Sequence, residues 1–413
     1  MTRIRNEIRQ SGILLAGTAG TVALSLAYTM YALRLLGPEA SSAFSLAVSF
    51  VAFCQIALGP INGTVARFSA KFAAEGDWGK VCALGRVCFR RTLMATVALL
   101  VPALAFVEPA SRFWNLATRA PLVLAYGIVA LTLVLSISRG LLRGLQSFGH
   151  LTANTVFEAA LRLAAGMVIL QFVPSATAAL GGFVIALVGV LLLSQWQLGG
   201  RLRTYATEPF DGREVVGFAG PLLLMMLASA GFQNGDMLAV KHLFPDLQAG
   251  LYGATFSIAR LIGALVTPFS ILLLPLLTSA HARGESTVGP LIRVVGYFVV
   301  LATAVLLAFG LFADRLVVLL FGSAFADAGA MLPAVASLRM VGFLCHLLAL
   351  AGAARNRFAC NYILIPSLLV QAALVRGSHE RMVDIVHIMF WSQLLTLALM
   401  VGLEVRQARN QRP

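Results

Sequence analysis

The chain has 413 residues, of which 59% are hydrophobic and only 12% are charged, and its mean hydropathy is +0.87. Soluble globular proteins carry about twice this charged fraction, so the composition excludes a water-soluble enzyme. The formal net charge is +14, but the basic residues lie between long apolar runs and not in one patch, so we expect no nucleic-acid partner.

Long apolar runs recur along the whole chain. A membrane-spanning helix needs about 20 apolar residues, because the hydrocarbon core of a bilayer is about 30 Å thick. The runs are continuous, which indicates helices and not the alternating strands of a membrane barrel. We predict twelve spans, at residues 11–36, 42–73, 84–107, 119–142, 151–173, 177–199, 214–242, 249–280, 289–312, 327–351, 358–375 and 381–404. Two of them, 42–73 and 249–280, are over-long, so we expect them to tilt or kink.

The positions of the basic residues predict the orientation of the spans. With the N-terminus in the cytoplasm, Lys and Arg are about three times as numerous at the cytoplasmic ends as at the outer ends. The N-terminal apolar run is too long for a signal peptide and has no cleavage site, so we expect a retained first span. Both termini are therefore expected in the cytoplasm.

Several kinds of chemistry have no motif in this sequence. We find no GxxxxGK[ST] loop for ATP phosphates, and the six His and five Cys show no metal-ligand spacing. We therefore expect no metal, no catalytic residues and no enzyme activity.

A repeat links the two halves of the chain. The segment RLLGPEASSAFSLA at 34–47 has a weaker echo in KHLFPDLQAGLYGA at 241–254, about half the chain length further on. Three residue pairs keep one offset: Arg34 with Lys241, Pro38 with Pro245, and Glu39 with Asp246. Because the offset covers six spans, both halves share one orientation, as in parallel-repeat transporters. We expect two six-helix lobes, residues 1–205 and 206–413, related by a pseudo-two-fold axis along the membrane normal.

Prolines stand at matching places in the two over-long spans. Pro60 lies in the first of them, and Pro268 and Pro275 lie in the second. A proline inside a helix removes a hydrogen bond and favours a kink, although prolines are also common in membrane helices that do not bend. We predict that these three residues are hinges.

Charged residues inside the predicted spans are the main candidates for function, because such charges usually face a cavity or a partner. Glu158 and Arg162 share one helix face, where they either pair to pack two helices or line a cavity. In an antiparallel helical hairpin, Asp236 and Arg260 differ by about 6 Å in depth along the membrane normal. They therefore either form an ion pair that fixes the two helices or line a water-accessible surface that binds a substrate or an ion. Arg339 has no carboxylate near it in sequence, and it either binds a ligand or caps backbone carbonyls.

The sign of these charges favours an anion. Several basic groups lie within or near the predicted spans, but only two acids, Asp236 and Glu158. Arginine can bind a phosphate through two parallel hydrogen bonds. A cation exporter is expected to show the opposite balance. The predicted substrate-binding residues are Arg260, Arg339, Arg162, Arg34, Lys241 and Arg67, although Arg34 also fits a snorkelling role and Arg67 an ordinary cytoplasmic-end charge.

Four stretches carry a resemblance to a known family: LLGPEASSAFSLA after the first span, RGLLRGLQSFGH at 139–150, FEAALRLAAG at 157–166, and GDMLAVKHLFPDLQAGLYGATFSIARLI at 235–262. Over nearly its whole length, the chain resembles the Wzx-type polysaccharide flippases of the multidrug/oligosaccharidyl-lipid/polysaccharide exporter superfamily. Related lipid II flippases typically carry two extra C-terminal spans, for which we find no counterpart among the twelve predicted spans.

The resemblance implies two six-helix lobes around a central cavity that opens alternately to each face of a bacterial inner membrane. It implies as cargo an undecaprenyl-pyrophosphate-linked glycan for a surface polymer such as an exopolysaccharide or O-antigen. On this interpretation Arg260, Arg339 and Arg162 neutralise the pyrophosphate. Asp236 and Glu158 hold the guanidiniums in place and are candidates for coupling to H+ or Na+. The expected partners are membrane lipids and a polymerase or other polysaccharide assembly proteins.

Three other functions stay open at this stage. A cation-coupled multidrug antiporter of the same superfamily needs acidic binding groups, of which only two are available. A membrane-embedded glycan polymerase or ligase tends to carry a long periplasmic loop with catalytic residues, and we predict no such loop in this sequence. A scaffold without transport leaves the intramembrane charges unexplained.

Overall fold

A computed structural model describes residues 2–202, 213–264, 286–355, 357–377 and 380–409 of the chain, with isolated residues between 269 and 280. The expectation of an all-helical membrane protein is confirmed, since every regular element in this part of the chain is a helix. In chain order the helices are α1 (Thr2–Ala57), α2 (Gly59–Ala74), α3 (Trp78–Ala105), α4 (Val107–Phe113), α5 (Ala120–Gly144), α6 (Phe148–Phe172), α7 (Ala176–Leu202), α8 (Arg213–Leu243), α9 (Asp246–Ala259), α11 (Val288–Phe321), the 3₁₀ helix η1 (Ser323–Met331), α12 (Leu332–Ala354), α13 (Asn361–Gly377) and α14 (Met382–Arg409).

Eight stretches of the described residues are long and apolar enough to cross a membrane. One of them, Ala16–Ala74, joins the first two predicted spans, because α1 continues past the break at Gly37 that separates these spans and α2 follows directly after Leu58. Part of the predicted span 249–280 lies outside the described residues, and α13 has only 17 residues. The count of twelve spans therefore stays a prediction.

The chain forms two compact units. Unit 1 consists of Met1–Leu36 and Phe50–Leu223, and unit 2 consists of Gly37–Ser49 and Leu224–Pro413. A short stretch of α1 thus belongs to unit 2 although both of its flanks belong to unit 1. The lobe boundary expected at residues 205 and 206 lies outside the described residues, so the two predicted lobes stay a prediction.

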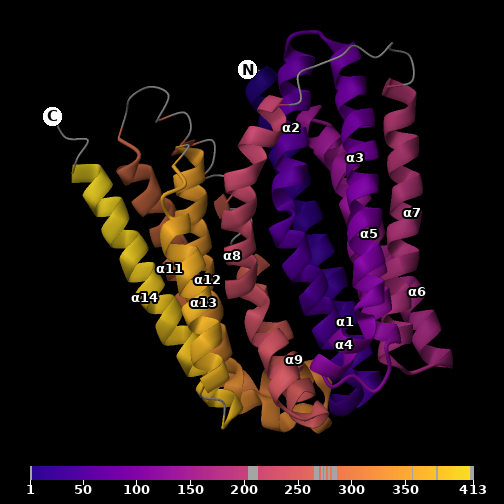
Figure 1. The fold of residues 1–413 in the computed structure, drawn as a ribbon, viewed down its shortest axis with the longest axis vertical. Helices are drawn as coiled ribbons and strands as arrows, with labels where there is room; N and C mark the ends of the chain where they lie inside the picture. Colours follow the sequence, from indigo (N-terminus) through magenta and orange to yellow (C-terminus); the bar gives the residue numbers. More distant parts are fainter. Residues whose placement is uncertain are drawn as a thin grey trace. The chain divides into compact units, whose positions relative to one another are not determined.

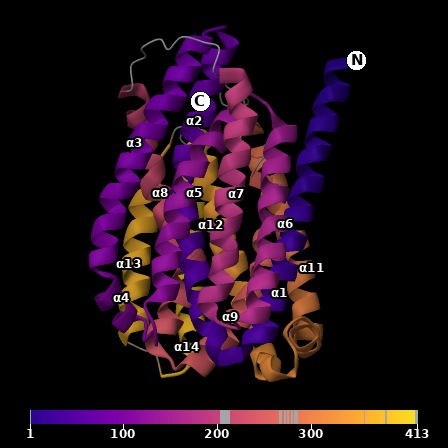
Figure 2. The same cartoon turned by 90° about the vertical axis from the view of Figure 1, so that its right-hand side faces the viewer.

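In unit 1, α7 runs beside both α5 and α6 (Figure 2). Helix α2 lies against α5, where Gly140 faces it. A Cβ atom on Gly140 would lie 2.8 Å from the Cβ of Val65 and 2.9 Å from the carbonyl oxygen of Asn62. Only glycine allows this close approach, so the crossing of α2 and α5 depends on it.

We therefore expect Gly140→Ala to destabilise the folded protein by about 1–3 kcal/mol, because α2 and α5 must move apart. The control is Gly127→Ala on the same helix, where an added Cβ meets no atom within 4 Å. That variant should be neutral or slightly more stable, since alanine favours a helix by up to about 1 kcal/mol over glycine. Thermal unfolding of both proteins in detergent checks the difference. Equal midpoints would contradict the close crossing.

In unit 2, α12 and α14 run side by side (Figure 1). The stretch Gly37–Ser49 packs on α9, where Ser45 lies against Gly253 and Ser42 donates a hydrogen bond to Asp246. Helix α1 is interrupted at Gly37, whose φ of 72° favours glycine. Beyond this break, a Cβ on Gly250 would collide with the carbonyl oxygen of Pro38. The two segments that the sequence repeat paired therefore meet in this unit, through residues 38–45 of the first and 250–253 of the second.

The predicted hinge prolines have different outcomes. Pro60 lies in the first turn of α2, where its missing N–H costs no helix hydrogen bond. The helical conformation is interrupted just before it, at Leu58, between α1 and α2. Pro268 and Pro275 lie outside the described residues. A hinge role for all three stays a prediction.

Candidate functional site

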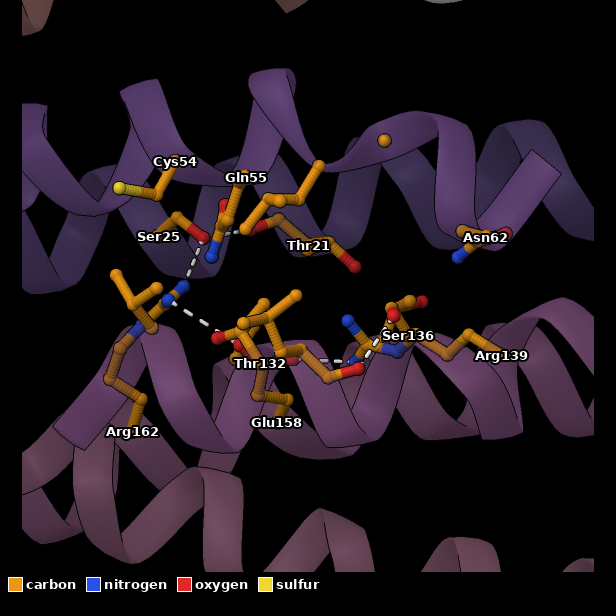
Figure 3. A pocket seen from close by; sticks show the side chains of 16 residues that line it. Thr21, Ser25, Cys54, Gln55, Asn62, Thr132, Ser136, Arg139, Glu158 and Arg162 are labelled. Atoms are coloured by element: carbon orange, nitrogen blue, oxygen red, sulfur yellow. Dashed lines mark hydrogen bonds and ion pairs between the residues drawn. The ribbon is translucent and has the colours of Figure 1, made fainter. Parts of the chain in front are cut away.

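A pocket of ≈ 350 Å³ lies within unit 1, between α1, α2, α5 and α6. Ser25 and Gln55 approach it from α1, and Glu158 and Arg162 approach it from α6 (Figure 3). Side chains with hydroxyl or amide groups make up much of the wall: Thr21, Ser25, Gln55, Asn62, Thr132, Ser136 and Thr155. Such groups suit a polar ligand, which is unusual inside a helix bundle as apolar as this one.

Three charged side chains meet in the pocket. The Nη2 of Arg139 lies 2.5 Å from the Oε2 of Glu158, and the Nη1 of Arg162 lies 3.8 Å from the Oε1 of the same carboxylate. Glu158 therefore stands between two guanidiniums that come from different helices. The three side chains are only 12 to 19% exposed, so the pocket holds one net positive charge with little solvent to screen it.

The Arg139 guanidinium is fixed from a second side. Its Nε donates a hydrogen bond to the Oδ1 of Asn154 at 2.9 Å. Asn154 is itself fully buried, and its Nδ2 donates to the Oγ of Ser194 at 2.7 Å. This chain of hydrogen bonds ties α5 to α6 and α7 and holds Arg139 at the pocket.

The Arg162 guanidinium is also fixed from behind. Its Nη2 donates to the Oγ of Ser25 at 2.5 Å, and its Cζ lies 4.6 Å from the ring centroid of Phe183. The ring of Tyr28 packs edge-on against Phe183, and its hydroxyl donates to the carbonyl oxygen of Ala179. A cation over an aromatic face is stabilised, so Phe183 helps to hold the Arg162 guanidinium in its position.

Unit 2 contains a second buried charge cluster. The Nη2 of Arg339 contacts the Oδ2 of Asp236, and the hydroxyl of Tyr252 donates to the same oxygen at 2.6 Å. The Arg339 Cζ lies 4.4 Å from the ring centroid of Phe256. Both charged side chains are about 1% exposed, so the cluster is closed within the unit.

This cluster corrects two expectations. Arg339 is expected to bind a ligand or to cap backbone carbonyls, but it pairs with Asp236, which α8 brings to it from 103 residues earlier in the chain. The expected pairing of Asp236 with Arg260 is replaced by a pairing with Arg339, since Asp236 is fully buried whereas Arg260 is exposed at the end of α9. Spacing within one hairpin could not indicate a contact between distant helices.

None of the remaining candidates lines the pocket. The side chains of Arg34 and Arg67 are exposed on α1 and α2. Lys241 is buried and pairs with Asp246, which also accepts a hydrogen bond from the Oγ of Ser42 at 3.0 Å. Of the predicted substrate-binding residues, the structure thus places only Arg162 in the pocket, together with Glu158.

The sequence analysis does not single out Arg139 or Asn154, because Arg139 looks like an ordinary basic residue at a cytoplasmic helix end. A signal for both was present. Gln146 lies in the turn between α5 and α6. Arg139 precedes Gln146 by seven residues, and Asn154 follows Gln146 by eight. In an antiparallel hairpin these two positions have nearly the same depth, so a polar pair could have been found there.

Comparisons with known proteins agree with this architecture. Residues 80–330 match a family model described as polysaccharide biosynthesis protein. No curated protein sequence matches the chain.

Solved structures of transporters have the same fold. A multidrug resistance MATE family transporter of the MOP superfamily in its inward-facing conformation superposes with a TM-score of 0.74 at 15% identity, covering 95% of this chain and 96% of that one. An outward-facing MATE family transporter gives a TM-score of 0.70 at 13% identity, covering 98% and 96%. A MATE structure in a straight conformation gives the same values. The expected similarity to this superfamily is therefore confirmed at the level of fold.

Proposed function

The chain belongs to the polysaccharide biosynthesis protein family, and from this premise we propose that it moves a polyprenyl-pyrophosphate-linked oligosaccharide from the cytoplasmic to the periplasmic leaflet. The observation that carries the proposal is the pocket of unit 1, where two guanidiniums face one carboxylate among hydroxyl and amide side chains. The proposal rests on the family, the transporter fold and this chemistry together.

The pocket suits the head of such a substrate. A pyrophosphate is an anion that guanidiniums bind through charge-assisted hydrogen bonds. Arg139 and Arg162 each contribute one guanidinium to the pocket. Sugar hydroxyls form hydrogen bonds with groups such as Thr132 and Gln55, which line the same pocket. The polyprenyl tail stays in the bilayer, because its transfer into a polar pocket is unfavourable.

The transport cycle is part of the same proposal. On this proposal the chain crosses a bacterial inner membrane twelve times with both termini in the cytoplasm, and lobes 1–205 and 206–413 expose a central cavity alternately to each side. Arg34, Arg67 and Arg260 remain candidates for contacts along the path of the substrate. Glu158 and Asp236 remain candidates for coupling to a proton or a sodium ion.

A second candidate function is export of a cationic drug. The fold favours it, because the solved structures with this fold include multidrug transporters. The charge of the pocket opposes it, since an excess positive charge repels a cation. A glycan polymerase or ligase has no such support from the fold.

A deletion strain tests the proposed function. Complete oligosaccharide repeat units linked to polyprenyl pyrophosphate should accumulate several-fold in its membranes, and the surface polymer should be lost, because assembly stops at translocation. Extraction and mass spectrometry of the lipid-linked glycans measure the accumulation, and a plasmid copy of the gene should reverse it. An unchanged lipid pool together with intact surface polymer would contradict the proposal, and drug export would then take its place.

A further inference from the structure

We propose that Glu158 is an internal substitute for a substrate phosphate. Its carboxylate occupies the place between Arg139 and Arg162 that a phosphate group takes when the substrate binds, and it competes with that phosphate during the cycle. This inference rests on the proposed function and assigns Glu158 the task of setting the affinity of the site.

The carboxylate fits the two guanidiniums unequally. It forms a short hydrogen bond with Arg139, at 2.5 Å, but its other oxygen is 3.8 Å from Arg162, beyond hydrogen-bond distance. The Nε of Arg162 is buried and has no hydrogen-bond partner in the described part of the chain. A phosphate, with more acceptor oxygens and more negative charge, is able to satisfy both guanidiniums at once.

The guanidiniums stay in place when the carboxylate leaves. Arg139 is held by Asn154, and Arg162 is held by Ser25 and by the ring of Phe183. Within the described residues, the polar contacts of Glu158 are with these two arginines. The cations are therefore preorganised by the fold, whereas the carboxylate is held only by the charges for which the substrate competes.

A resident competitor is useful to a transporter. Binding must be strong enough to capture the substrate and weak enough to release it on the other side of the membrane. Two free guanidiniums in a pocket with little solvent would hold a pyrophosphate tightly. When Glu158 returns to its place, it lowers the affinity and speeds release.

The test uses the full chain in phosphatidylcholine nanodiscs, titrated with inorganic pyrophosphate. Glu158→Gln should bind pyrophosphate about tenfold more tightly than the wild type, because the competing charge is gone. Adding Arg139→Gln or Arg162→Gln to this variant should remove the gain. The matched control is Glu404→Gln, which makes the same change in a carboxylate bonded at 2.7 Å to both Nη1 and Nη2 of Arg355 in unit 2, and which should leave pyrophosphate binding unchanged.

Transport of the lipid-linked substrate gives a second readout. Glu158→Gln should lower KM and lower the maximal rate about fivefold or more, because capture improves and release slows. A merely structural role for Glu158 would weaken binding and transport together. Should the amide variant fail to fold, Glu158→Asp serves instead. It keeps the charge but is one methylene too short to reach both arginines, so a smaller gain in pyrophosphate affinity is expected.

The outcomes separate the two proposals. Unchanged or weaker pyrophosphate binding in folded Glu158→Gln, or in Glu158→Asp where that variant replaces it, overturns the role of Glu158, and so does an absence of binding in every protein. The proposed function then still stands if the wild type moves its lipid-linked substrate. Tighter binding in Glu158→Gln supports the role of Glu158 even if the wild type moves no such substrate, a result that would contradict the proposed function alone.

Discussion

Replacing Arg162 by Gln should lower the transport rate about 10- to 100-fold while the protein still folds. A hydrogen bond to a charged group contributes about 1.5–3 kcal/mol, and the loss of one guanidinium from a pocket with little solvent removes at least one such bond to the pyrophosphate. Arg139→Gln should have a similar effect, since both guanidiniums face the same carboxylate. Restoration of surface polymer in the deletion strain, scored against the amount of folded protein in the membrane, measures this loss.

The control for these variants is Arg112→Gln. Arg112 is an exposed basic residue of unit 1 that pairs with Glu108 on α4, away from the pocket. The Arg112→Gln variant loses one positive charge, as the two test variants do. If the loss of overall charge alone slowed transport, this variant would be slower as well. Full transport activity in both Arg139→Gln and Arg162→Gln would contradict the proposal that these two residues bind the substrate.

Replacing Arg339 by Ala should instead destabilise the protein, by about 3–5 kcal/mol. The change leaves the Asp236 carboxylate buried without its counter-charge, and breaking a buried ion pair from one side is costly. The double variant Arg339→Met with Asp236→Asn should recover much of the stability, because it leaves no unpaired charge. Thermal unfolding and the yield of folded protein in detergent compare the two.

This prediction separates a structural role from a binding role for Arg339. A binding residue would give folded, inactive protein when replaced, whereas the buried pair predicts loss of the folded state. A folded and stable Arg339→Ala protein would therefore show that the cluster does not hold unit 2 together. In that case Arg339 would return as a candidate for substrate binding.

The helices and their membrane setting could be predicted from the sequence, because apolar runs longer than about 20 residues have few alternatives. The pairing of Glu158 with Arg162 was also accessible, since residues four apart share one face of a helix. These features depend on short-range spacing, which a single sequence displays directly.

Features that join distant helices could not be predicted in this way. Asp236 and Arg339 are 103 residues apart, and no local pattern indicates that α8 and α12 bring them together. The assignment of Gly37–Ser49 to unit 2 was equally inaccessible, because it depends on how closely Gly250 allows Pro38 to approach. Arg139 is an intermediate case. Its depth in the hairpin could be predicted from its spacing to the turn, but its residue type and position are also those of an ordinary charge at a helix end.

The most direct test of the account is a translocation measurement with the purified protein. Wild-type protein is reconstituted into vesicles that contain a polyprenyl-pyrophosphate-linked oligosaccharide, and a glycosidase is added outside to report which glycans are accessible. We predict that the wild type makes the glycans of the inner leaflet accessible, whereas protein-free vesicles and vesicles with Arg162→Gln keep them protected. Continued protection of the inner leaflet by folded wild-type protein would contradict the proposed function.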